Sequence, residues 1–335
     1  LTKAFAGVQG AVFSKRAPWP FDLSQAPLLR STLVEQEGGH YTWLLDLHHI
    51  ISDGTSHAIL AGDFIALYNE EVLAPLRLHY KDFSQWQQRL WASGAIKSQE
   101  DYWLGLFSGE IPRLNWPTDF KRPAVFTFAG ARYSFSLPAE EVFKSRRLAA
   151  NNGGTLYMNI LAAVNVLFYR YTGQTDIIIG SGTAGRPHAD LQHIIGMFVN
   201  MLAMRNYPQG EKRYEPFLRE VIAASVRAFE NQDVQFEELV DRLNLERDPS
   251  RNPLFDISMV VQNYRRGEIN PGAEWAGNKT AAPGEYRTPT SKFDLTFFVQ
   301  EREDDLEFTI EYYTGIFKAE TVASLAAHFQ NILRE

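Results

Sequence analysis

Two adjacent histidines at the end of an apolar run are the residues best suited to chemistry. His48 and His49 follow the run Tyr41 to Leu47 and precede the polar turn Ser52-Asp53-Gly54. A neutral imidazole can accept a proton near pH 7, as a general base must. Side chains alternate along a strand, so one histidine is expected to face a cavity while the other packs inward. The residues alone leave open a general-base site and an ordinary pair of polar side chains.

The turn after the histidines has residue types that can hold a loop in place. Asp53 can pair with an arginine or accept hydrogen bonds from backbone amides. Gly54 permits a tight turn and a close approach of a ligand to the backbone. The segment therefore predicts a fixed loop that presents one histidine.

Other site chemistries have less support. The chain has no cysteine, which excludes a thiol nucleophile and thiolate metal ligands. Adjacent histidines point apart, so no metal site is predicted. The Gly-x-Ser-x-Gly elbow of serine hydrolases is absent. Gly180-Ser181-Gly182 lacks the Lys-Ser/Thr ending of a phosphate loop and is interpreted as a strand exit.

Composition narrows the class of protein further. The chain has 335 residues, which suits two lobes better than one core. The net charge is −7 with no basic run, so nucleic-acid binding is not expected. No apolar stretch reaches the ~20 residues that would span a bilayer, so no membrane partner is expected. The lack of cysteine fits a cytoplasmic protein.

The elements that must position the histidines come in the order strand, tight loop, helix. Leu28 to Val34 and Tyr41 to Leu47 predict a β-hairpin, and apolar residues at helical spacing from Ile59 to Leu67 predict a helix. Two more helices are expected at Lys81 to Ala92 and Ala95 to Phe107. Gly109 to Gly130 loses periodicity and predicts a linker.

The second half mixes strands and helices, which makes the class α/β or α+β. Strands are predicted at Arg132 to Leu137, Asp176 to Ser181, Phe198 to Met204, Phe293 to Gln300 and Leu306 to Tyr312, the last two as a hairpin about Glu303-Asp304-Asp305. Helices are predicted after Pro138 and at Leu156 to Tyr171, Tyr214 to Glu230, Phe236 to Leu243 and Lys318 to Leu333. Arg265 to Pro289 is polar, rich in Gly and Pro, and is predicted to be a loop.

Five motifs in a fixed order resemble those of the condensation domains of nonribosomal peptide synthetases. The first is His48-His49-x-x-x-Asp53-Gly54, which chloramphenicol acetyltransferases share in shorter form. The others run from Tyr80 to Trp86, Ile195 to Arg205, Asn231 to Glu237 and Arg247 to Leu254. Two departures, Gln235 for Pro and Met201 for Thr, are peripheral. The family's first two motifs are absent before Phe21-Asp22-Leu23, so the sequence is expected to be N-terminally incomplete.

The resemblance implies a fold, partners and a cofactor source. The family has two chloramphenicol acetyltransferase-like lobes that form a V-shaped pseudo-dimer, here residues 1–118 and 119–335. Donor and acceptor peptidyl carrier proteins bring acyl thioesters on 4'-phosphopantetheine arms into a tunnel between the lobes, and an adenylation domain is adjacent. No cofactor or metal is expected to be bound by this domain itself.

The resemblance also implies site roles. His49 matches the catalytic histidine, which deprotonates the attacking amine or only holds it, and the Gly54 amide is a candidate oxyanion donor. His48 and Asp53 are expected to be structural, with Arg186 or Arg170 as the partner of Asp53. Candidates to line the tunnel are Ser52, Asn200 and Ser291.

Two alternatives remain at this stage. An epimerisation domain has the same fold but usually continues the motif as Asp-Gly-x-Ser-Trp, whereas Thr55-Ser56-His57 follows here. An inactive module that only docks carriers is the second alternative. The motif is closest to that of domains with an L-configured donor, and the substrates themselves are not encoded in a short pattern.

Overall fold

The computed structural model describes residues 20–35, 38–39, 41–262, 290–301 and 305–335. By their internal contacts these residues divide into two compact units. Unit 1 contains the described residues up to Gln87 together with Arg186–Val199, and unit 2 contains the others. The predicted boundary after residue 118 falls inside unit 2, and the division into lobes at that position stays a prediction.

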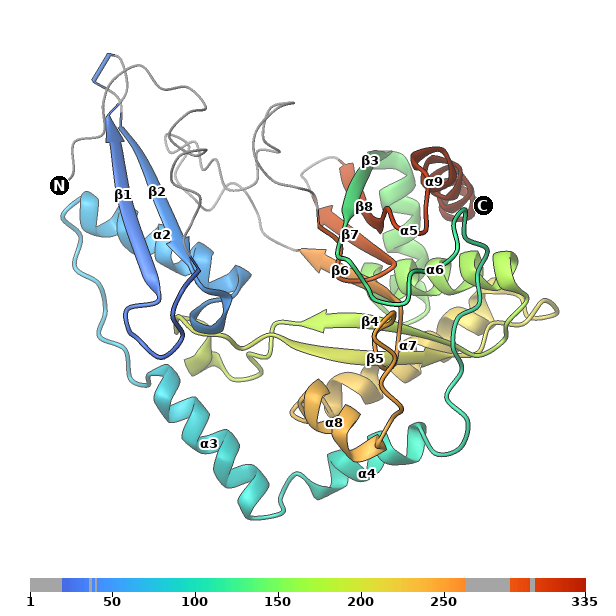
Figure 1. Cartoon of the computed structure of the whole chain (residues 1–335), viewed down its shortest axis with the longest axis horizontal. Helices are drawn as coiled ribbons and strands as arrows, with labels where there is room; N and C mark the ends of the chain where they lie inside the picture. The colour runs from blue at the N-terminus through green and yellow to red at the C-terminus, as the bar shows by residue number, and fades with distance from the viewer. Residues whose placement is uncertain (1–19, 36–37, 40, 263–289, 302–304) are drawn as a thin grey trace. The chain divides into compact units, whose positions relative to one another are not determined.

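Unit 1 is built on an antiparallel hairpin and one long helix (Figure 1). Strands β1 (Leu29–Glu35) and β2 (Tyr41–Leu47) pair in register from Leu29↔Leu47 to Glu35↔Tyr41, as the sequence predicts. A short 3-10 turn, η1 (His49–Ile51), leads into α2 (Gly54–Tyr68). Trp43 of β2 stacks on Phe64 of α2 with ring centroids 4.1 Å apart, which fixes the helix on the hairpin. A second 3-10 turn, η2, covers Ala189–Leu191.

Unit 2 is a mixed sheet with helices packed against it. The six strands lie in the order β3-β8-β7-β6-β4-β5. Only the pairs β4–β6 and β6–β7 are parallel. The strands are β3 (Gly130–Pro138), β4 (Ile177–Thr183), β5 (Asn200–Asn206), β6 (Ile257–Gln262), β7 (Leu295–Glu301) and β8 (Asp305–Tyr313). The helices are α4 (Lys97–Leu106), α5 (Ala139–Asn151), α6 (Leu156–Thr172), α7 (Tyr214–Glu230), α8 (Phe236–Leu243) and α9 (Ala319–Arg334), while α3 (Tyr80–Ala92) begins in unit 1.

The outer strand pair shows why the sheet has one apolar and one polar face. Phe135 of β3 stacks on Phe308 of β8 with centroids 5.0 Å apart, and Phe329 of α9 packs edge-on against Phe308. On the opposite face, Ser134 and Thr309 share a hydrogen bond of 2.9 Å. Alternation along the strands therefore sends the aromatic residues to the helices and the hydroxyls away from them.

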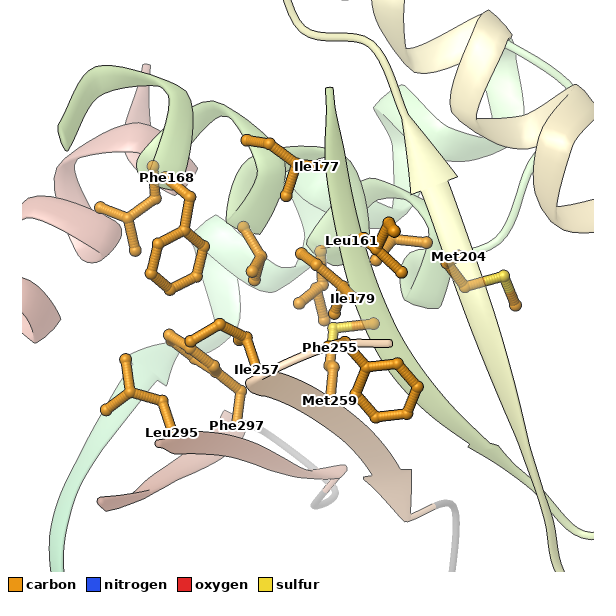
Figure 2. Close-up of a cluster of buried hydrophobic side chains, with 14 of the residues drawn as sticks. Leu161, Phe168, Ile177, Ile179, Met204, Phe255, Ile257, Met259, Leu295 and Phe297 are labelled. Atoms are coloured by element: carbon orange, nitrogen blue, oxygen red, sulfur yellow. The ribbon is translucent and has the colours of Figure 1, made fainter. Parts of the chain in front are cut away.

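The core of unit 2 lies where α6 meets the middle of the sheet (Figure 2). Leu161 and Phe168 of α6 gather with Ile179 of β4 and Phe297 of β7, all with at most 1% of their surface exposed. Strand β6, whose Met259 lies in the same cluster, was not predicted. It is a short run buried between two parallel neighbours, where period-two alternation is lost.

The other predicted elements are confirmed apart from their ends. Helices α7 and α8 have the predicted bounds, and Pro138 is the N-cap of α5 and not its first helical residue. The predicted loop Arg265 to Pro289 lies wholly outside the described residues, and so does most of the expected turn between β7 and β8.

Two buried aspartates, Asp256 and Asp294, lie directly before the first residues of β6 and β7. Arg122 forms a two-point ion pair with Asp294, with one contact of 2.8 Å, and Arg251 pairs with Asp256. Burial, and secondly the charge of Asp294, raises the pKa of Asp256 to about 6. Arg251 belongs to the Arg247 to Leu254 motif, so this part of the motif stabilises unit 2.

Gly180→Ala should destabilise unit 2, because a Cβ at Gly180 would lie 2.0 Å from Cε2 of Phe255. Overpacking of this kind costs about 1–3 kcal/mol. Gly182→Ala, on the same face of β4, is the control, since its nearest neighbour, Met201 Sδ, is 3.9 Å away. Urea unfolding of the purified proteins measures both costs, and equal costs would contradict this packing.

Asp256→Asn should change how stability depends on pH. An acid whose pKa rises from 3.8 to about 6 on folding stabilises the protein below pH 3.8 and loses that contribution as pH rises through 6. The free energy of unfolding of the variant should therefore gain about 2 kcal/mol on the wild type between pH 4 and pH 7. Urea unfolding at both pH values tests this, and a difference that does not vary with pH would refute it.

Candidate active site

The two histidines occupy different environments at the end of β2. The strand ends at Leu47, so strand alternation does not extend to His49, which starts η1. His48 is half-buried; its Nδ1 accepts a hydrogen bond of 3.1 Å from the Ile50 amide, and its ring meets Phe21 edge-on. His49 is exposed. The half-buried position of His48 and the exposed position of His49 therefore result from the 3-10 turn and not from the pleat of a strand.

Asp53 ties this turn to the helix that follows. It is the N-cap of α2, where its Oδ1 accepts hydrogen bonds from the Ser56 amide at 2.8 Å and from the Ser56 hydroxyl at 2.7 Å. An aspartate at this position satisfies a free amide and complements the positive end of the helix. Gly54, the first residue of α2, is exposed. Its amide lies at a helix start, where backbone donors have no partner within the helix.

Asp53 also forms a fully buried ion pair with Arg186. Nη2 of Arg186 lies 3.1 Å from Oδ1 and 3.3 Å from Oδ2 of Asp53, and the side chains are 1% and 0% exposed. Nη1 donates to the carbonyls of Leu191 and Ile194, both at 2.6 Å. Of the two arginines that the sequence leaves open, Arg186 makes the contact; Arg170 lies on α6 in unit 2.

The segment Arg186–Val199 closes around this pair. Phe198 lies under the Arg186 guanidinium, 4.0 Å from it, and donates its amide to Asp53 Oδ2 at 3.1 Å. The Tyr80 hydroxyl donates to the Met197 carbonyl at 2.8 Å. Gly196 has no room for a side chain, because a Cβ would lie 2.1 Å from the Tyr80 ring. Three of the motifs noted in the sequence thus meet around one ion pair.

His57 is the residue of this region that sequence reasoning did not select. It lies on the first turns of α2, with its Nε2 3.2 Å from the hydroxyl of the buried Ser52. Partial burial lowers the pKa of His57, the neighbouring His49 lowers it further, and Asp53 opposes the shift. Its spacing from Asp53 was the available signal, because the residue four positions after a helix N-cap lies one turn above the cap on the same face.

The two tunnel candidates of unit 2 are fully engaged within that unit. The Asn200 amide nitrogen donates to the carbonyls of Gln232 and Val234, and its oxygen accepts from the amides of Met201 and Phe236. Ser291 is 0% exposed and donates to the Phe293 carbonyl at 2.6 Å. Hydrogen bonding of this kind supports the structural interpretation of Asn200.

Two features are absent from the described residues. They contain no group of three or more His, Asp or Glu side chains arranged to hold a metal ion. Within the same residues, no helix is both long and apolar enough to cross a membrane.

Comparison with known proteins decides the family. The model of a family described as "Condensation domain" matches residues 10–335. The chain belongs to the condensation domain family. It is 46% identical over 316 residues to bacitracin synthase 3 of Bacillus licheniformis, and 45% identical over 315 residues to tyrocidine synthase 3 of Brevibacillus parabrevis. Each alignment covers 94% of this chain and 5% of the synthase, so the chain spans a small part of the length of these relatives.

A solved structure supports the fold. The condensation domain of the monacolin K polyketide synthase MokA superposes with a TM-score of 0.83 at 17% identity, covering 96% of this chain and 75% of that one. The mixed α/β architecture is therefore that of condensation domains. The family match and the relatives together show a condensation domain of the nonribosomal peptide synthetase kind. They do not favour an epimerisation domain.

Asp53→Asn should strongly destabilise unit 1 of this condensation domain. Removing one partner of a buried ion pair leaves the charge of Arg186 uncompensated, at a cost of about 3–5 kcal/mol. Asp190→Asn is the control, because it breaks a pair in the same unit whose arginine, Arg77, is 83% exposed; that change should cost about 0–1 kcal/mol. Urea unfolding measures the free energy of both, and a small cost at Asp53 would contradict a structural role for the pair.

Proposed function

We propose that this condensation domain joins a donor aminoacyl or peptidyl thioester to the amine of an acceptor aminoacyl thioester. The acceptor nitrogen attacks the donor carbonyl carbon, a C–N bond forms, and the C–S bond breaks. The thiol leaves with the proton that the nitrogen gives up, so the step needs no oxidant or other reactant. The observation that carries the proposal is the exposed His49, held by the buried Asp53 network in a chain that matches the family from residue 10 to 335.

His49 is the proposed catalytic residue. Its exposed imidazole is available to accept the proton of the attacking amine or of the tetrahedral intermediate, or to hold the amine by a hydrogen bond. Aminolysis of a thioester is downhill, so holding the two reactants together can supply much of the rate. His48 is not proposed for this step, because its Nδ1 already accepts the Ile50 amide.

Gly54 is the proposed donor to the developing oxyanion. Its amide stands at the start of a helix of 15 residues, where the peptide dipoles favour negative charge. The Asp53 carboxylate points instead into the network with Ser56 and Arg186, so it does not compete for the amide of Gly54. The loop thus offers a base at His49, and the start of the helix that follows offers a donor to an oxyanion at Gly54.

We further propose that the substrates arrive on donor and acceptor peptidyl carrier proteins. Their 4'-phosphopantetheine arms would supply the thioesters, with an adenylation domain adjacent in the same protein. The family match and the much longer relatives support this arrangement. The domain itself would supply only the residues of the site and bind no cofactor.

His49→Ala in the full-length protein that contains this sequence tests the function. Two carrier proteins are loaded with aminoacyl groups, and the dipeptidyl carrier is measured by mass spectrometry. Loss of general-base help should lower its formation by about 10²-fold or more. His79→Ala, an exposed histidine at the start of α3, is the control and should keep the wild-type rate.

The outcomes separate the alternatives. Inversion of one aminoacyl centre without dipeptide would indicate epimerisation. No product from a folded wild type would indicate an inactive docking module. Equal product from wild type and His49→Ala would show that positioning without His49 suffices, and the site assignment would be wrong.

A further inference from the structure

The hydroxyl of Ser52 lies directly after the turn that presents His49 and is within hydrogen-bond distance of a side chain of the next helix. Ser52 is 2% exposed, and its Oγ is 3.2 Å from Nε2 of His57. A buried hydroxyl requires a partner, because leaving it unpaired costs the free energy of removing it from water. His57 supplies that partner from the next element, α2.

Backbone hydrogen bonds also connect the segment from His49 to His57. The His57 amide donates to the Asp53 carbonyl at 3.1 Å, and the Ser52 amide donates to the His49 carbonyl at 3.3 Å. His57 is therefore bonded at its backbone to the N-cap of α2 and at its ring to the residue before that cap. Directly after His49, the Ile50 amide donates to the His48 ring, and before it the His48 amide donates to the Leu28 carbonyl.

The surroundings of His57 lower its pKa, chiefly through partial burial of the ring. The groups that act on it are His49 in η1 and Asp53 at the helix start, and the Asp53 carboxylate is already paired with Arg186. Its pKa is lowered first by partial burial of the ring and secondly by His49. A neutral His57 adds no positive charge beside the histidine that is proposed to receive a proton.

We propose that His57 is a positioning residue that holds the turn carrying His49 through the Ser52 hydroxyl. This inference rests on the proposed function for its kinetic consequence, but not for its structural one. His57 touches neither reactant in this scheme. It keeps the η1 turn in the conformation that presents the His49 imidazole.

Four variants of the full-length protein test the inference. His57→Ala removes the ring contact, His57→Gln keeps a group that can bond Ser52, and Ser52→Ala removes the partner. The fourth combines His57→Ala with Ser52→Ala, and His79→Ala is the control for loss of an exposed histidine. Two quantities are measured: amide hydrogen exchange of the peptide that covers residues 49–53, and the rate of dipeptidyl transfer between saturating loaded carriers.

The expected pattern separates positioning from general stability. His57→Ala and Ser52→Ala should each raise exchange in the peptide and lower the transfer rate by about tenfold, the equivalent of one lost hydrogen bond. His57→Gln should restore both, and the double variant should be no worse than either single one, because both remove the same contact. The carrier concentration that gives half of the maximal rate should not change.

Two results would overturn the inference. One is unchanged exchange in residues 49–53 when His57 is replaced by Ala. The other is additive losses in the double variant. If exchange behaves as expected while the wild type forms no dipeptide, the proposed function fails and the positioning role stands, so the two failures are distinguishable.

Discussion

The arrangement of unit 1 depends on one buried ion pair, Asp53 with Arg186. A charge with no exposed surface is tolerated only when its partners are complete, and here every oxygen of Asp53 accepts at least two contacts. The same carboxylate caps α2 and receives the Phe198 amide. One side chain therefore fixes a helix start, a turn and a distant segment of the chain together.

This arrangement explains why motifs far apart in the sequence are each so specific. Arg186 must present its guanidinium to Asp53 while its other nitrogen binds two carbonyls of the next turn. Gly196 must lack a side chain because the Tyr80 ring fills that space. These residues contact one another within unit 1. A residue can thus belong to the motif of a reaction and act only through packing.

The sequence predicted elements well where periodicity was strong and less well where tertiary contacts decide. Helices α7 and α8 were predicted to the residue, because apolar residues recur at helical spacing in both of them. Strand β6 was missed because it is short and has parallel partners on both sides. At the site, the His-Asp-Gly pattern predicted the loop, but it could not choose between Arg186 and Arg170, since the choice depends on how the chain returns from β4. It could not reveal His57 either, whose role depends on the contact of one ring nitrogen with Ser52.

The site combines a loop that is held by hydrogen bonds with one exposed side chain, that of His49. The chemistry gives a reason for this combination. Aminolysis of a thioester needs little driving force, so the protein gains most by reducing the freedom of the reacting groups before they meet. An imidazole on a loose loop would lose that advantage even with a suitable pKa. Here the His48 amide bonds to the Leu28 carbonyl before His49, and the Ile50 amide bonds to the His48 ring after it, while the His49 side chain stays exposed. Burial energy and hydrogen bonds are thus concentrated on the neighbours of the catalytic residue, because the catalytic side chain itself must stay accessible to its substrates.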